Sequence, residues 1–226
     1  GLSPGTNSYF RVRGASSSGT SGNSNVVSLL TRPDAPVALD ASNKTQTGFT
    51  ANWSAAAGAD GYSIEVGLDD HFNSYVPGYQ NLRVGNVTSL SISGLTPNTA
   101  YFYRIRGYNN GGESINSNVI NVPTLPNVPA APVALPAVAV TQTGFTAMWN
   151  IASGAQGYYL DVASDINFTN LLPGYGNFDA GNNPAFGITG LTANTQYFYR
   201  VRGYNSGGTG NYSNTITVNT LPNTPT

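Results

Sequence analysis

Cysteine is absent from the 226 residues, and lysine and histidine each occur once. Without cysteine the chain can form neither a disulfide framework nor a thiolate site. No zinc-binding histidine cluster, phosphate loop or Gly-x-Ser-x-Gly motif occurs. Because nucleophilic and acid-base sites need several convergent groups, we expect no enzyme and no cofactor.

Charge is also scarce, with nine Lys and Arg against ten Asp and Glu. This near balance indicates no nucleic-acid interface, which would need basic clusters that the sequence lacks. Most of the arginines fall in a recurring Arg-x-Arg motif, which suggests fixed cross-strand partners rather than a binding patch.

Long apolar runs are missing as well. No run of 18 apolar residues, no charged and apolar leader and no lipidation signal is present. We therefore expect no membrane span in this segment, and we expect any export or anchoring signal of the parent protein to lie elsewhere.

Few polar residues could carry chemistry. His71 follows Asp69 and Asp70, and the equivalent position 96 residues later is Asn167, so we interpret His71 as an exposed loop residue. Asp69, Asp70 and Asp165 offer oxygen ligands of the kind calcium prefers, but solvated loop acids are the preferred interpretation, and we predict no metal site.

The strongest signal is a repeat with an offset of 96 positions. Residues 45–51 recur letter for letter as 141–147, and Trp53 recurs as Trp149. A truncated third copy opens the chain, because residues 1–14 match residues 94–107. The chain therefore begins inside a repeat, and the period suits a small domain rather than a solenoid unit.

Each repeat contains short segments rich in Val, Ile, Thr, Tyr and Phe, broken by Gly, Asn and Pro. This pattern predicts an all-β sandwich. In residues 101–106 the period of two places Tyr101, Tyr103 and Ile105 in the core, and Phe102, Arg104 and Arg106 in solvent. The same alternation turns Glu65 and its equivalent Asp161 outward, where we expect them to form cross-strand pairs with the arginines.

These motifs resemble the fibronectin type III family. The resemblance is carried by Trp53 and Trp149, Tyr62 and Tyr158, and Gly-Leu-Thr-x-Asn-Thr-x-Tyr at residues 94–101 and 190–197. It implies tandem seven-stranded antiparallel sandwiches of immunoglobulin-like architecture. It also implies that Tyr101 and Tyr197 form the family's tyrosine corner, whose hydroxyl bonds to nearby backbone.

Proline-rich joints separate the repeats and should be extended, semi-rigid spacers. The predicted organisation is the last two strands of one domain at 1–32, a domain at 33–124, a linker at 125–132, a domain at 133–221 and the start of another linker at 222–226. We expect the missing strands of the first domain to precede residue 1 in the parent chain, or another chain to donate them.

Exposed aromatic side chains are the candidate contact sites. The chain has no Arg-Gly-Asp in the loop between the last two strands, so integrin-type adhesion is not supported. The candidates lie on the outer strand face, in the Pro-Gly-Tyr loops and at the turn before the last strand: Phe102, Phe198, Tyr79, Tyr175, Tyr108 and Tyr204. They could cover their own domain, contact a neighbouring subunit or stack on a glycan.

The leading functional hypothesis is a structural repeat array of an extracellular bacterial surface protein, forming a stalk, filament or sheath with an adhesive or self-associating role. The bacterial and extracellular assignment follows from resemblance to members of the family. The alternatives are a spacer module of a secreted polysaccharide-degrading enzyme, or an adhesin that binds glycans or a host.

Overall fold

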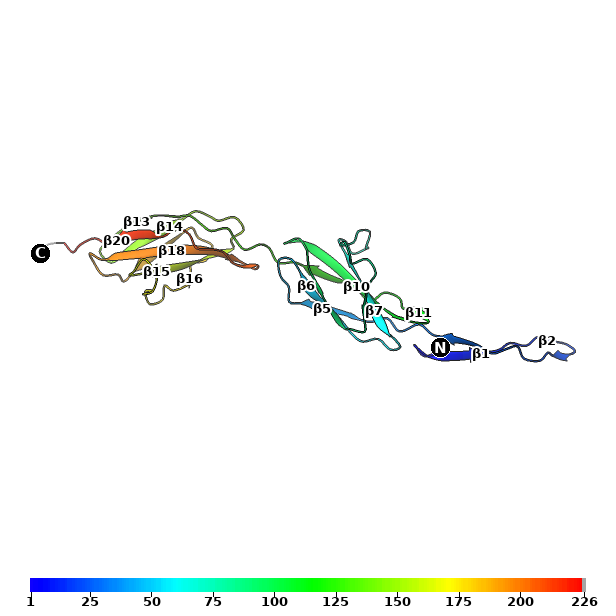
Figure 1. Cartoon of the computed structure of the whole chain (residues 1–226). Coiled ribbons are helices and arrows are strands. Elements are labelled where there is room, and N and C mark those ends of the chain that lie inside the picture. Colours follow the sequence, from blue (N-terminus) through cyan, green and yellow to red (C-terminus); the bar gives the residue numbers. More distant parts are fainter. Residues whose placement is uncertain (225–226) are drawn as a thin grey trace. The chain divides into compact units, whose positions relative to one another are not determined.

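Every strand of the chain pairs antiparallel in the computed structural model, which describes residues 1–224 (Figure 1). The chain divides into two compact units, of which the first comprises Gly1–Leu125 and the second begins at Pro126. The structure confirms the predicted all-β fold. Residues 1–224 contain no helix that could span a membrane.

The first unit contains one complete sandwich of two sheets. The three-stranded sheet consists of β5 (Ala38–Ser42), β6 (Phe49–Trp53) and β9 (Ser89–Ile92). The facing sheet consists of β8 (Leu82–Gly85), β7 (Gly61–Gly67), β10 (Ala100–Asn109) and β12 (Ile120–Pro123), with the short β11 (Gly112–Glu113) folded back on β10.

The second unit repeats this topology. Its three-stranded sheet consists of β13 (Ala134–Val138), β14 (Gly144–Trp149) and β17 (Ala185–Thr189). Its facing sheet consists of β16 (Phe178–Asp179), β15 (Gly157–Ala163), β18 (Gln196–Asn205) and β20 (Ile216–Asn219), with β19 (Gly208–Thr209) at the turn.

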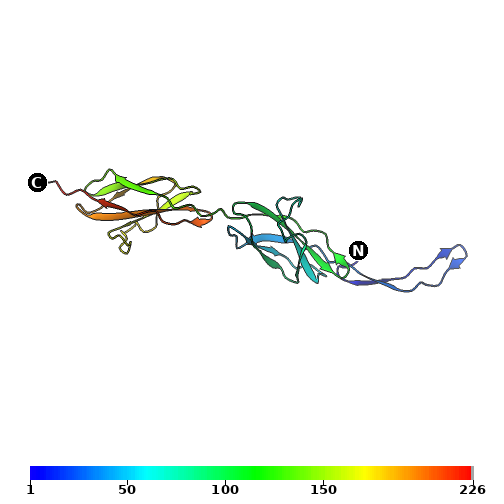
Figure 2. The ribbon, with the colours of Figure 1, turned by 45° about the horizontal axis from the view of Figure 1, so that its top comes forward.

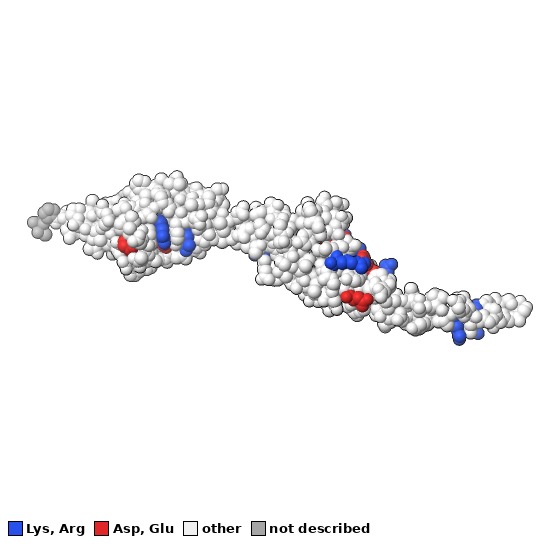
Figure 3. All heavy atoms as spheres, viewed as in Figure 1, with Lys and Arg blue, Asp and Glu red and all other residues white. Residues whose placement is uncertain are grey.

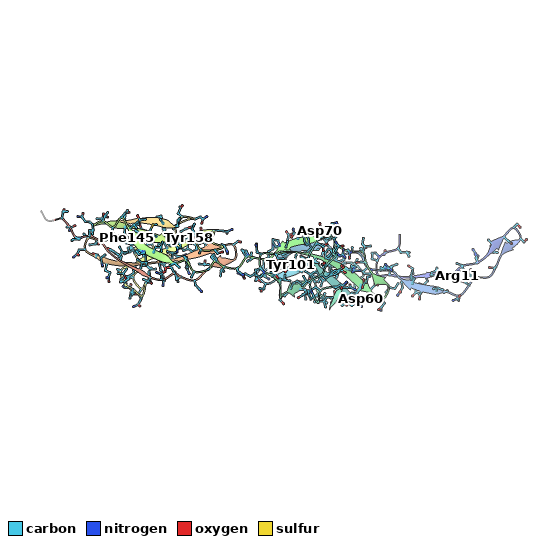
Figure 4. The ribbon with its side chains drawn as sticks, turned by 90° about the horizontal axis from the view of Figure 1, so that it is seen from above. Arg11, Asp60, Asp70, Tyr101, Phe145 and Tyr158 are labelled. Atoms are coloured by element: carbon cyan, nitrogen blue, oxygen red, sulfur yellow. The ribbon has the colours of Figure 1, made fainter. Side chains whose placement is uncertain are left out.

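Alternating side chains of the long strands fill the space between the two sheets. In β10 the side chains of Tyr101, Tyr103 and Ile105 are buried, as predicted. The ring of Tyr103 stacks on Phe49, with ring centroids 5.9 Å apart. In the second unit Phe145 and Tyr158 occupy the same kind of position and lie in its core (Figure 4). Burying these aromatic rings supplies much of the hydrophobic stabilisation of each sandwich.

The tyrosine corner is confirmed in both sandwiches. The Tyr101 hydroxyl accepts a hydrogen bond of 2.9 Å from the Thr96 N–H, and the Tyr197 hydroxyl accepts one of 3.0 Å from the Thr192 N–H. Each bond satisfies a backbone donor in the loop before the strand and so holds that loop against the core.

Residues 1–32 form a hairpin without a second layer of strands over it (Figure 2). Its strands are β1 (Asn7–Phe10), β2 (Ala15–Ser16), β3 (Gly19–Thr20) and β4 (Val27–Leu30). The hydrogen bond from the Val12 N–H to the Ser24 hydroxyl, 3.0 Å, matches the bond from Ile105 to Ser117 in the complete sandwich. The apolar side chains that would face a core are exposed, because Val12 keeps 66% of its surface whereas its equivalent Ile105 keeps none.

The chain enters and leaves each sandwich at opposite ends. In the second unit the Asn205 side-chain amide donates to the carbonyls of Asn127, at 2.8 Å, and Gly154, at 3.0 Å, which holds the entering chain. At the other end the Leu221 N–H donates to the Thr141 carbonyl at 2.9 Å.

The first unit has the same contacts, in which Asn109 holds the Thr31 carbonyl at 2.9 Å and the Leu125 N–H bonds to Thr45. The loop glycines next to these contacts lie in tight turns. Gly112 and Gly208 adopt positive φ, at 124° and 127°, which side chains other than glycine rarely tolerate.

Candidate interaction surfaces

The outer face of β7 and β10 carries a network of ion pairs. Glu65 contacts Arg104 at 2.6 Å and Arg106 at 2.8 Å, and Arg106 also contacts Glu113 at 3.2 Å. The strand register places Glu65 directly opposite Arg104. The predicted cross-strand pairs are therefore confirmed.

The two acids point outward, as predicted, but they are buried. Glu65 keeps only 5% of its surface and Asp161 only 3%. The arginines account for part of this burial, because their long side chains lie over the acids while keeping their own heads near water. Buried carboxylates are retained here because each one is hydrogen-bonded to a guanidinium.

In the second unit the outer face is built from alternating aromatic and basic side chains. The Arg200 guanidinium lies 4.0 Å from the Phe168 ring centroid and 3.7 Å from that of Tyr212. Arg202 lies 4.6 Å from the same Tyr212 ring. Figure 3 shows the basic atoms of this unit, which come from Arg200 and Arg202, beside acidic ones. Cation–π contacts of this kind fix the arginines against the sheet.

The outer faces of the two sandwiches differ near the ends of β10 and β18, where Tyr108 and Tyr204 lie. In the first, Arg83 lies 4.4 Å from the Tyr108 ring centroid and 3.6 Å from Glu113. In the second, Tyr204 stacks on Tyr159 with ring centroids 4.5 Å apart.

The second sandwich also replaces a base with an acid at this end. The Tyr204 hydroxyl donates to Asp179 at 3.0 Å, and Asp179 stands where the first repeat has Arg83. This hydrogen bond raises the pKa of Tyr204, because it stabilises the protonated phenol.

The predicted aromatic contact residues divide into three groups. Phe198 is buried against Ala163 and Phe168, so its predicted exposure is wrong, and Phe102 is half-buried. Tyr79 and Tyr175 pack against the cores of their own sandwiches. Tyr108 and Tyr204 are half-buried and lie on the outer face. The covering role is thus the one that the geometry favours for the loop tyrosines.

The loop after β7 is held by its own acid. The Asp69 carboxylate accepts hydrogen bonds from the backbone N–H groups of His71 at 3.0 Å, Asn73 at 3.2 Å and Ser74 at 3.1 Å. The bond from the Asn73 N–H has the largest effect on the pKa of Asp69 and lowers it. Burial acts in the opposite direction, but the remaining bonds lower the pKa further, so it lies below its usual value. His71 is exposed, as predicted.

Sequence reasoning missed Phe72, Phe168 and Tyr212, although they cover the arginines. Phe72 and Phe168 adopt positive φ, at 60° and 57°, which is unusual for an aromatic residue. The sequence offered one signal for these two phenylalanines: the motif Asp-x-x-Phe occurs in both repeats, at residues 69–72 and 165–168. Tyr212 had no such signal, because the first repeat has Asn116 at that position.

Each of the two units contains two stacked sheets and one tyrosine corner, and the sequence contains no cluster of catalytic groups. The chain is therefore a tandem of immunoglobulin-like β-sandwich modules. The model of the fibronectin type III domain matches residues 34–123 and 130–219. The chain therefore belongs to the fibronectin type III family. Tandem domains of this family are typically non-catalytic modules.

Proteins of several kinds are similar to this chain. Endoglucanase B of Cellulomonas fimi is 30% identical over 82% of the chain and 18% of its own length. Contactin-5 of Danio rerio is 31% identical over 57% of the chain and 12% of its own length. The chain thus spans less than a fifth of these curated relatives.

The crystal structure of chicken CNTN1 FN1-FN3 domains shares the fold. It has a TM-score of 0.53 and 18% identity, and the match covers 96% of this chain and 77% of that one.

Proposed function

We propose that the chain is a non-enzymatic structural array of an extracellular bacterial surface protein, which forms a stalk, filament or sheath and associates with itself or with neighbouring domains. The observation that carries this proposal is that the chain enters each sandwich at one end and leaves it at the other. Each sandwich holds the entering segment at one end and the leaving segment at the other, with the same Asn and Leu contacts in both repeats. Repetition of such a unit supplies length.

The outer strand face supports a role in contacts. Half-buried Tyr108 lies under the Arg83 guanidinium, and half-buried Phe102 and Tyr204 belong to β10 and β18, the strands that carry the other arginines of the two sandwiches. Aromatic and arginine side chains are enriched at protein interfaces. We propose these three residues as surface contacts.

A spacer in a secreted polysaccharide-degrading enzyme is the second candidate. It is favoured by the similarity to a protein named Endoglucanase B over 82% of the chain. On this proposal the chain contributes reach and its catalytic partner lies elsewhere in the parent protein. The third candidate, a glycan-binding or host-binding adhesin, would use the same outer face.

Sedimentation over a wide concentration range, with electron microscopy of the same samples, distinguishes these proposals. Self-association and regular fibres are the result expected for an array. Monomers at every concentration, without fibres, would overturn the array and leave the spacer. Substituting Tyr108 and Phe102 with Ser should reduce association several-fold, whereas Tyr9→Ser on the hairpin should not.

A further inference from the structure

One arginine of the second sandwich has lost the carboxylate partners that its equivalent keeps. In the first sandwich Arg106 contacts both Glu65 and Glu113. The equivalent Arg202 has no carboxylate within 4.0 Å among residues 1–224. Two sequence changes account for this difference.

The first change is Thr209, which stands where the first repeat has Glu113. The second is Asp161, which replaces Glu65 and is one methylene shorter. Among residues 1–224 Asp161 forms an ion pair with Arg200 alone, at 3.0 Å, and its other oxygen accepts the Asn177 N–H at 2.7 Å. Neither change leaves an acid for Arg202.

The Arg202 side chain is nevertheless held in place. One terminal nitrogen donates to the Asn177 side-chain oxygen at 2.7 Å, and the guanidinium lies 4.6 Å from the Tyr212 ring centroid. Its Nε is buried and has no hydrogen-bond acceptor within residues 1–224. A guanidinium has five N–H donors, and leaving buried donors unpaired is unfavourable. The buried Nε cannot itself reach a ligand, but the side chain is only half-buried, and its terminal N–H groups, of which one is bonded to Asn177, have donor capacity for a ligand.

Aromatic and acidic groups flank this arginine. Tyr159 lies directly opposite Arg202 in the strand register and stacks on Tyr204, and the first repeat has Ser63 at the Tyr159 position. Both tyrosines are half-buried and so present part of their rings to solvent. The exposed Asp179 lies at the Tyr204 hydroxyl, 3.0 Å away, and can accept further hydrogen bonds.

We propose that this face of the second sandwich is a binding site for an acidic saccharide of the hexuronate class. A hexuronate carries a carboxylate for Arg202, hydroxyl donors for Asp179 and an apolar C–H ring face for the tyrosines. An acidic peptide side chain offers the carboxylate without the hydroxyl donors. Phosphate monoesters fit less well, because they carry more negative charge than a carboxylate and Asp161 and Asp179 repel them more strongly. Arg202 is the specificity-determining residue of this site.

The test uses the full chain at a concentration where sedimentation shows a monomer, so that failure of the proposed self-association does not affect the outcome. The probes are polygalacturonate and neutral dextran in affinity electrophoresis. We expect retardation by polygalacturonate alone. Arg202→Gln should weaken it at least tenfold and Tyr159→Ser several-fold, whereas Arg83→Gln, an exposed arginine of the first sandwich, should leave it unchanged.

Thr209→Glu provides the decisive variant, because it restores the acid of the first repeat without removing Arg202. We expect it to abolish retardation while the melting temperature stays the same or rises. The inference is wrong if the native chain is not retarded by polygalacturonate, if dextran retards it equally, or if both Arg202→Gln and Thr209→Glu retain binding. Retardation by polyglutamate in place of polygalacturonate would instead assign the site to an acidic peptide.

Discussion

Single hydroxyl groups on tyrosine secure loops and strands in both sandwiches. Tyr101 and Tyr197 each accept a backbone N–H in the loop before their strand. The Tyr103 hydroxyl donates to the Leu39 carbonyl and so links the two sheets, and Tyr199 repeats this link with Leu135. Each contact depends on a single hydroxyl oxygen, so a substitution of tyrosine by phenylalanine removes the contact and keeps the ring.

Tyr101→Phe should lower the free energy of unfolding of the first sandwich by about 1 to 3 kcal/mol, because the Thr96 N–H loses its acceptor. Urea unfolding of the native and substituted chains measures the difference. Tyr9→Phe is the control, because the Tyr9 side chain is 69% exposed and no hydrogen bond to its hydroxyl is seen in residues 1–224. Equal losses in the two variants would contradict the role of the corner.

Tyr103 and Tyr199 should make the chain less stable in alkali. Burial raises the pKa of both hydroxyls above their ordinary value of 10.0. Folding therefore favours the protonated form, so this contribution to stability is fully present below about pH 10 and is lost as the pH rises through the raised values.

The measurement is the free energy of unfolding between pH 8 and pH 11.5. Tyr103→Phe and Tyr199→Phe should each show a shallower alkaline decline than the native chain. A decline with the same slope in all three proteins would show that these hydroxyls titrate equally in the folded and unfolded states.

At the scale of the strand, alternation predicted the inner half of β10 and misjudged the outer half. Tyr101, Tyr103 and Ile105 follow from the period of two, because alternate side chains of a sandwich strand face the core and are mostly apolar or aromatic. Phe198 was expected to be exposed, yet it is buried, and Glu65 points outward as expected but is also buried. The cover over Phe198 comes from Phe168, 30 positions away, and a local pattern contains no information about contacts of that range.

The candidate contact sites were less predictable than the fold for a related reason. A tyrosine in a Pro-Gly-Tyr loop has the same local sequence whether it packs on its own core or faces solvent. The Tyr175 ring centroid lies 5.7 Å from that of Phe178, and Tyr175 packs against the core cluster. The sequence did not single out Arg202, because what distinguishes it is the absence of acidic partners on two other strands, β15 and β19.

The hairpin at 1–32 and the equivalent hairpin of the first sandwich give a matched pair of substitutions. Ile105→Ala should cost about 2 to 5 kcal/mol, because it removes a fully buried side chain from a packed core. Val12→Ala at the equivalent position should change stability by less than about 0.5 kcal/mol, since the side chain is 66% exposed.

Thermal unfolding of the two variants, monitored by tryptophan fluorescence, measures both effects. A large cost for Val12→Ala would show that another part of the protein or a second molecule covers the hairpin in solution.

At the scale of the whole chain, each complete sandwich closes its own hydrophobic core. The core cluster of the first sandwich is formed by residues between positions 38 and 122, and that of the second by residues between positions 134 and 218. The two clusters share no residue. Each sandwich is therefore expected to unfold as a cooperative unit of its own.

Leu160→Ala should lower the midpoint of one calorimetric transition and leave the other in place. Leu160 is fully buried in the second core, and its truncation should cost about 2 to 5 kcal/mol. Calorimetry of the full chain makes the measurement, with Ile64→Ala, the equivalent change in the first core, as the reciprocal case. A single transition that shifts as a whole in both variants would contradict independent unfolding.

The opposite placement of entry and exit has a mechanical consequence. Tension on the chain would pull β13 and β20 of the second sandwich, which lie in different sheets, in opposite directions along their lengths. The hydrogen bonds of each terminal strand would then be loaded together in shear rather than opened one after another. Rupture under such a load is governed by the unfolding rate, so a module of this design can resist pulling for far longer than its equilibrium stability alone would indicate.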